Sequence, residues 1–95
     1  MLHIQDQSTI QHMRKNVENA TMATMPQLME ELPSLVELAH SSKRELKLEL
    51  LEVAASIVDK LVELAPEVTT DPGWPRYAEM RKKLADDIMH TRFAV

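Results

Sequence analysis

A stretch near the middle of the chain is apolar on two sides when it is drawn as a helix, and this pattern limits the possible folds more than any other. On a wheel of 100° per residue, two sets of aliphatic side chains point in directions about 140° apart. The first set is Leu46, Leu50, Val53, Ile57, Leu61 and Leu64, and the second is Leu48, Leu51, Ala55, Val58 and Val62. The apolar arc spans about 220°, roughly twice the stripe of an ordinary surface helix. Both sides must therefore be covered by other elements.

The composition favours helices as the covering elements. The chain has 95 residues with one glycine and three aromatic residues, so the residue types typical of tight turns and strands are scarce. A chain of this length forms one domain with one core. We therefore expect residues 1–95 to fold as a single all-α domain, a small bundle of four to five helices around one long central hydrophobic helix at about 43–65.

Helix boundaries are predicted from capping pairs and prolines. A Ser or Thr followed three residues later by Glu or Gln is typical of a helix start, and a proline disfavours the helical conformation of the residue before it. Pro33 and Pro66 should therefore end helices. The capping pairs are Ser8 with Gln11, Thr24 with Gln27, Ser34 with Glu37, and Ser42 with Glu45. Together these signals predict helices at 9–22, 25–32, 35–40, 43–65 and 75–91.

One boundary stays open in the sequence. The spacing of apolar residues continues across Ser41 and Ser42, so a single helix over residues 34–65 is an alternative to a break at these serines. Such a helix would be about 48 Å long and would favour an elongated dimer. The longest connection, 66–74, contains the only glycine, Gly73, and the prolines Pro66 and Pro72, which indicates an ordered turn.

The outer helices provide few apolar residues for covering the central one. The first has a narrow seam that includes Ile10, Met13 and Val17, and the last has Tyr77 and Leu84 on its apolar side. We therefore expect one side of the central helix to be covered only in part, and a homodimer or a protein partner to cover the rest. The predicted dimer interface consists of Leu48, Leu51, Ala55, Val58 and Val62. In the alternative, a monomer, the outer helices cover both sides.

Two groups of residues are candidates for binding a partner. The chain has seven methionines, and flexible thioether side chains line adaptable binding surfaces as well as filling gaps in cores. Trp, Tyr and Arg are enriched at binding hot spots. The predicted partner-binding residues are Met22, Met25, Leu28, Met29, Trp74, Tyr77 and Arg81. The alternative roles are core packing for the methionines and a snorkelling side chain for Arg81.

Few combinations of residues could support chemistry. One glycine cannot build a phosphate-binding loop or a nucleophile elbow, and the chain has no cysteine. The pair Glu37 and His40 has the Glu-x-x-His spacing of di-iron bundles, but such a site needs this pair twice. The histidines at 3, 12, 40 and 90 show no zinc-binding spacing. We expect no catalytic residues, no metal and no cofactor.

Charge and hydropathy define the remaining expectations. Eleven Lys and Arg against fifteen Asp and Glu give a net charge of −4, which opposes binding to nucleic acid and to anionic lipid. No segment approaches the roughly 20 apolar residues of a membrane span.

Lys43 and Arg44 oppose the dipole at the start of the central helix, so they have another use or pair with Glu30 and Glu31. A chain without cysteines is compatible with the cytoplasm, where we expect it.

The function that these patterns favour is a non-enzymatic protein–protein interaction module, acting as a homodimer or bound to a protein partner. Small acidic helical proteins of this kind include adaptors, chaperones, inhibitors and regulators, among them bacterial and phage proteins. One alternative is a nucleic-acid-binding transcriptional regulator. A second alternative is a helical protein that binds a metal through carboxylate and histidine side chains.

Overall fold

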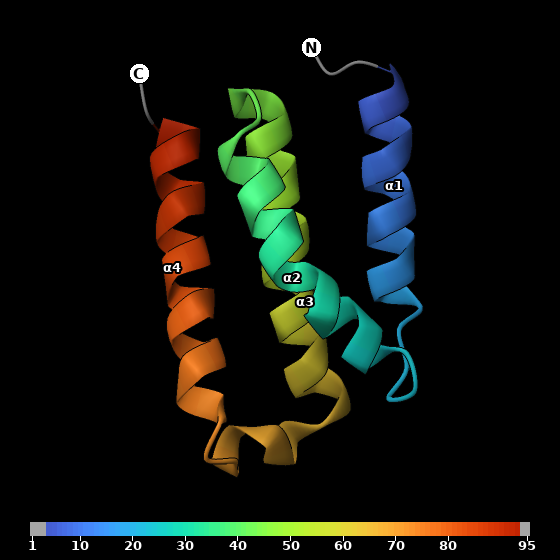
Figure 1. Cartoon of the computed structure of the whole chain (residues 1–95), viewed down its shortest axis with the longest axis vertical. Helices are drawn as coiled ribbons and strands as arrows, with labels where there is room; N and C mark the ends of the chain where they lie inside the picture. The colour runs from blue at the N-terminus through green and yellow to red at the C-terminus, as the bar shows by residue number, and fades with distance from the viewer. Residues whose placement is uncertain (1–3, 94–95) are drawn as a thin grey trace.

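The computed structural model describes residues 4–93, and every regular element within them is helical. The elements are α1 (Ile4–Glu18), α2 (Met25–His40), α3 (Arg44–Leu64), the short 3₁₀ helix η1 (Pro66–Thr70) and α4 (Trp74–Phe93). The α-helices lie along the long axis of a body measuring 40 × 26 × 18 Å (Figure 1). The prediction of an all-α bundle is confirmed.

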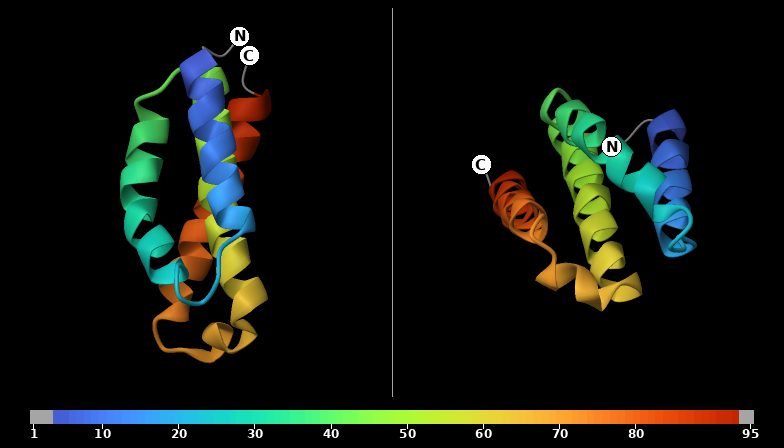
Figure 2. Two further views of the ribbon diagram at one scale, coloured as in Figure 1. Left: turned by 90° about the vertical axis from the view of Figure 1, so that its right-hand side faces the viewer. Right: turned by 60° about the horizontal axis from the view of Figure 1, so that its bottom comes forward.

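α3 is the central helix of the bundle. Each of the other α-helices packs mainly against α3 rather than against another outer helix. Figure 2 shows α3 between α1 and α4, with α2 on a further side. The buried residues of α3 are Leu50, Leu51, Val53, Ala54, Ala55, Ile57 and Val58. A fully buried aliphatic side chain of this size contributes about 1.5–3 kcal/mol, so α3 supplies the largest share of the core.

The second apolar side of α3 is covered within the chain more completely than we expected. α4 packs along α3, and Leu51, Ala55 and Val58 are only 0%, 4% and 1% exposed. Leu48 and Val62 are half-buried. The surface predicted to pair two copies is therefore not exposed as a whole, because three of its residues belong to the core of one chain. The oligomeric state itself stays a prediction.

α4 covers this side with a few well-placed residues. Leu84 is 2% exposed, while Trp74, Met80 and Ile88 are half-buried against the core. Met80, Leu84 and Ile88 recur every four positions, so they share one face of α4.

α2 continues through Pro33, where the sequence predicted two separate helices. A proline inside a helix removes one backbone hydrogen bond and bends the axis. α2 does change direction along its length, and its first half leans toward the end of α1 (Figure 1). Leu32 and Leu35, on either side of the proline, are 1% and 8% exposed. Burial of both residues against α3 stabilises the continuous helix despite the lost hydrogen bond.

The break between α2 and α3 falls at the two serines, so the single helix over 34–65 does not form. The hydroxyls of Ser41 and Ser42 both donate to the carbonyl oxygen of Leu38, at 3.0 and 2.7 Å. These bonds add to the one that the same carbonyl accepts from the Ser41 backbone N–H, at 3.2 Å, and close the end of α2. The N-cap of α3 is Lys43, one residue later than the predicted cap at Ser42.

Two of the four capping pairs predicted helix starts: Thr24 directly precedes α2, and Ser42 lies one residue before the N-cap of α3. Ser8 and Ser34 lie inside α1 and α2, so neither begins a helix. Thr24 is at the N-cap of α2, but its hydroxyl donates to the carbonyl oxygen of Thr21, at 3.2 Å, and accepts from the Thr21 backbone N–H, at 2.9 Å. This local turn competes with helix formation and helps to end α1 before the predicted residue 22. The predicted end before Pro66 is confirmed, because α3 ends at Leu64 and η1 begins at Pro66.

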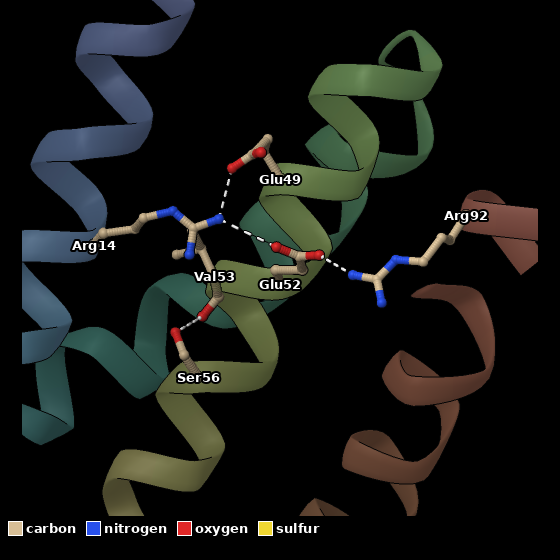
Figure 3. A network of polar contacts seen from close by, with 6 residues as sticks. All are labelled: Arg14, Glu49, Glu52, Val53, Ser56 and Arg92. Carbon is tan, nitrogen blue, oxygen red and sulfur yellow. Dashed lines mark hydrogen bonds and ion pairs between the residues drawn. The ribbon is translucent and has the colours of Figure 1, made fainter. Parts of the chain in front are cut away.

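Ion pairs attach α1 and α4 to the polar strip of α3. Arg14 on α1 donates to Glu49 at 2.6 Å and to Glu52 at 3.3 Å, while Arg92 on α4 donates to the other oxygen of Glu52 at 2.7 Å (Figure 3). The hydrogen bond to Glu49 is the main cause of a raised pKa for Arg14, although partial burial acts in the opposite direction. Glu52 thus connects the two helices that flank this strip.

Arg44 has a use that the sequence did not define. Its Nε donates to the backbone oxygen of Thr91 at 3.0 Å, and its Nη2 donates to that of Arg92 at 2.8 Å. Both oxygens lie in the last turn of α4, where carbonyls lack helical partners and the dipole favours a cation. Of the two alternatives for Arg44, a use other than pairing with Glu30 and Glu31 is the one that the structure shows, because the guanidinium caps α4.

We predict that Leu51→Ala lowers the free energy of unfolding by about 2–5 kcal/mol, because it removes a fully buried side chain and leaves a cavity. Leu38→Ala is the matched control, since Leu38 is 50% exposed, and it should change stability by less than about 1 kcal/mol. Urea unfolding followed by circular dichroism measures both. Equal losses would show that α4 does not cover Leu51.

We also predict that Glu52→Gln lowers the free energy of unfolding by about 1 kcal/mol, because it weakens contacts to two helices at a partly exposed site. The loss should shrink in 1 M salt. Glu79→Gln is the control: Glu79 is exposed and makes no ion pair within residues 4–93. If both variants unfold alike, Glu52 does not join α1 and α4.

Candidate protein-binding groove

An apolar groove opens at the end of the bundle where α2 and α4 begin. It has a volume of about 480 Å³ and lies over the last turns of α3 and over η1. Three of the predicted partner-binding methionines and the predicted tyrosine meet in it. The lining residues are Met22, Met25, Pro26, Met29, Glu30, Leu61, Val68 and Tyr77. We call this surface the methionine groove.

The three methionines of the groove have different environments. Met25 is 2% exposed and belongs to the core, whereas Met22, in the turn before α2, is 54% exposed. Met29 follows Met25 by one helical turn and is half-buried. The core and binding roles considered for the methionines are therefore divided between residues, with Met25 in the core and Met22 on the surface. A large exposed thioether beside an apolar groove is a surface that another protein could cover.

Tyr77 forms the α4 side of the groove and is supported by Trp74. The ring centroids of Trp74 and Tyr77 are 6.5 Å apart with a tilt of 38°, a favourable distance for an aromatic pair. Trp74 is half-buried against the core. It fixes the start of α4 and leaves Tyr77 at the groove wall, so only one of these two predicted binding residues lines the groove.

Arg81 does not line the methionine groove. Its Nε and Nη2 donate to the two carboxylate oxygens of Asp59 on α3, at 2.9 and 3.1 Å. This two-pronged hydrogen bond is the main cause of a raised pKa for Arg81. The side chain therefore attaches α4 to α3, and sequence spacing could not reveal this role because the two residues are 22 positions apart.

Leu28 lies on the other side of α2, in a separate groove between α1 and α2. That groove has a volume of about 210 Å³ and a mostly apolar lining that includes Met13, Val17 and Leu38. Leu38 is 50% exposed and was not among the predicted binding residues. Its position three residues after Leu35 could have indicated that the apolar face of α2 is wider than α3 alone can cover.

His40, which was considered for metal binding together with Glu37, contacts a different carboxylate. His40 Nε2 is 3.3 Å from Asp87 Oδ2 on α4, while the Glu37 side chain is exposed. Within residues 4–93, no three side chains of the types that ligate metals gather in one place. His3 lies outside the described residues. The contact between His40 and Asp87 instead joins the end of α2 to α4.

The larger basic side chains are mostly engaged within the chain. Arg14, Arg81 and Arg92 donate to carboxylates of α3, and Arg44 donates to backbone oxygens of α4.

Comparison with protein-family models, with curated proteins and with solved structures found no match. In the described part of the chain, none of the helices combines the length and apolarity needed to cross a bilayer.

We predict that Met25→Ala and Met22→Ala have different effects on stability. Met25→Ala should lower the free energy of unfolding by about 2–5 kcal/mol because Met25 is buried in the core. Met22→Ala should change it by less than about 1 kcal/mol because much of the side chain is in water. Thermal and urea unfolding of both variants checks this difference. A large loss for Met22→Ala would mean that this residue serves packing and not binding.

Proposed function

We propose that this chain is a non-enzymatic protein–protein interaction module that binds another polypeptide in the methionine groove. The observation that carries the proposal is Met22, which is 54% exposed at the edge of a groove formed by Met25, Met29 and Tyr77. Exposed apolar surface is unfavourable in water, and its burial against a partner lowers the free energy. The groove thus has a surface suited to contact with a protein.

The chemistry of the lining supports contact more than catalysis. The methionines are polarizable and adjust to different partner side chains, and Tyr77 adds a rigid ring with a hydroxyl that can donate or accept. Glu30 is the one ionisable carboxylate among the lining residues. A binding surface of this kind fits an adaptor, an inhibitor or a regulator that acts by occupying a partner, including a second copy of the chain.

The test is site-specific photocrosslinking in cells of the source organism. A photoreactive phenylalanine analogue in place of Met22 should give a discrete adduct with one polypeptide, because a partner would lie within contact distance. The matched control carries the same analogue in place of Gln11, an exposed residue on α1 that does not line the groove. Adducts from position 22 alone support the proposal. Absence of an adduct at position 22, or equal adducts from both positions, would contradict it.

A further inference from the structure

The groove between α1 and α2 exists because these helices pack mainly on α3 rather than on each other. We call it the α1–α2 groove. Its apolar part, with a volume of about 210 Å³, is lined by Val17 of α1, Leu35 of α2, and Val53 and Ile57 of α3. All four residues are buried. A ligand in this part would therefore contact the core of the bundle through three helices.

The α1–α2 groove continues into a polar part beside the turn that joins the two helices. The polar part has a volume of about 300 Å³ and shares Asn16, Leu28 and Glu31 with the apolar part. Its other lining residues are Asn19, Thr24 and Gln27. The groove thus offers apolar surface at one end and amide, hydroxyl and carboxylate groups at the other, which suits an amphipathic ligand.

Glu31 is the one charged residue among the residues that line either part. On a helical wheel it points within about 40° of Leu35 and Leu38, so its carboxylate lies on the side of α2 that faces the groove. The side chain is exposed and makes no ion pair within residues 4–93. A carboxylate beside an apolar pocket, with no cation of its own chain as a partner, favours a ligand with a positive charge.

The basic side chains of α1 do not supply a cation to the groove. Arg14 points about 160° from Asn16 on the wheel and is held by two carboxylates of α3. Lys15 points about 160° from Val17, and neither Lys15 nor His12 is a lining residue. An anionic ligand such as a fatty acid would therefore meet a carboxylate and no cation in the lining.

We propose that the α1–α2 groove binds a small amphipathic amine, with its apolar group in the apolar part and its ammonium group beside Glu31. An apolar cavity of about 150 Å³ holds a benzene molecule, so this part accepts an aromatic ring with some of an alkyl linker. An ammonium has three N–H donors, which the Glu31 carboxylate and the side-chain carbonyl oxygens of Asn16 and Gln27 can accept. The site is separate from the methionine groove, so this inference goes beyond the proposed function.

The experiment titrates the full chain with three probes of similar length: 4-phenylbutylammonium, 4-phenylbutanol and 4-phenylbutyrate. Methionine methyl NMR reports the site, because Met13 lines the α1–α2 groove whereas Met22 and Met29 line the methionine groove. The amine should shift the Met13 resonance saturably and leave those of Met22 and Met29 unchanged. The alcohol should bind more weakly than the amine, and the carboxylate most weakly, because only the amine gains a charged partner.

Substitution of Glu31 gives the sharper test. E31Q should weaken the binding of the amine roughly two- to fivefold and leave that of the alcohol unchanged, because it removes the charge and keeps the shape. E31K should reverse the preference, so that the carboxylate binds more tightly than the amine. The controls E37Q and E37K change the net charge equally at an exposed glutamate of α2 that lines neither part, and both should keep the wild-type order. Circular dichroism confirms that each variant keeps its helices.

Several results would overturn this inference. Shifts at Met22 and Met29 instead of Met13 would place the amine in the methionine groove. Failure of the amine to bind, equal binding of the three probes, or an effect of E37Q as large as that of E31Q would show that Glu31 does not select a cation in the α1–α2 groove. Crosslinking at Met22 tests the proposed function separately, because Met22 does not line this groove.

Discussion

Burial of α3 is the interaction on which the rest of the structure depends. Its aliphatic residues occupy an arc too wide for one neighbour, so α1, α2 and α4 each cover part of it. Leu51 and Val58, on one side, and Val53 and Ile57, on the other, are all nearly inaccessible to water. The outer helices are therefore arranged around a shared axis, and their mutual spacing follows from the width of α3. The grooves between them are a direct result of this arrangement.

Charged contacts then fix how the outer helices sit. Glu52 accepts from α1 and α4 at once, and Asp59 holds Arg81 with both oxygens. Arg44 closes the free carbonyls at the end of α4. Each of these contacts lies near the surface and adds little free energy by itself. Together they set the rotation of α4, which decides that Tyr77 borders the groove and that Arg81 does not.

The sequence was most informative where burial alone decides the structure. The two-sided pattern of residues 45–65 predicted the central helix to within a residue or two at each end. The sequence was least informative where a distant contact outweighs a local preference. Pro33 favours a helix end, yet burial of Leu32 and Leu35 against α3 keeps α2 continuous.

The candidate groove was predictable in part, for the same reason. Helical spacing placed Met25 and Met29 on one face, but nothing local could bring Tyr77 beside them. The ion pair of Arg81 with Asp59 and the position of Leu28 on the opposite side of α2 depend on the packing of whole helices. Local spacing therefore identified which residues were candidates, and the tertiary arrangement determined which of them meet.

The scarcity of contacts between outer helices affects how the molecule loses its structure. α1 buries only Ile10 and Val17 along its length and packs chiefly on α3, so its detachment would leave the other helices in place. α2 and α4 would remain on the shared axis, with Val53 and Ile57 newly open to water. We therefore expect unfolding to begin with the detachment of α1, because this helix costs the least free energy to release.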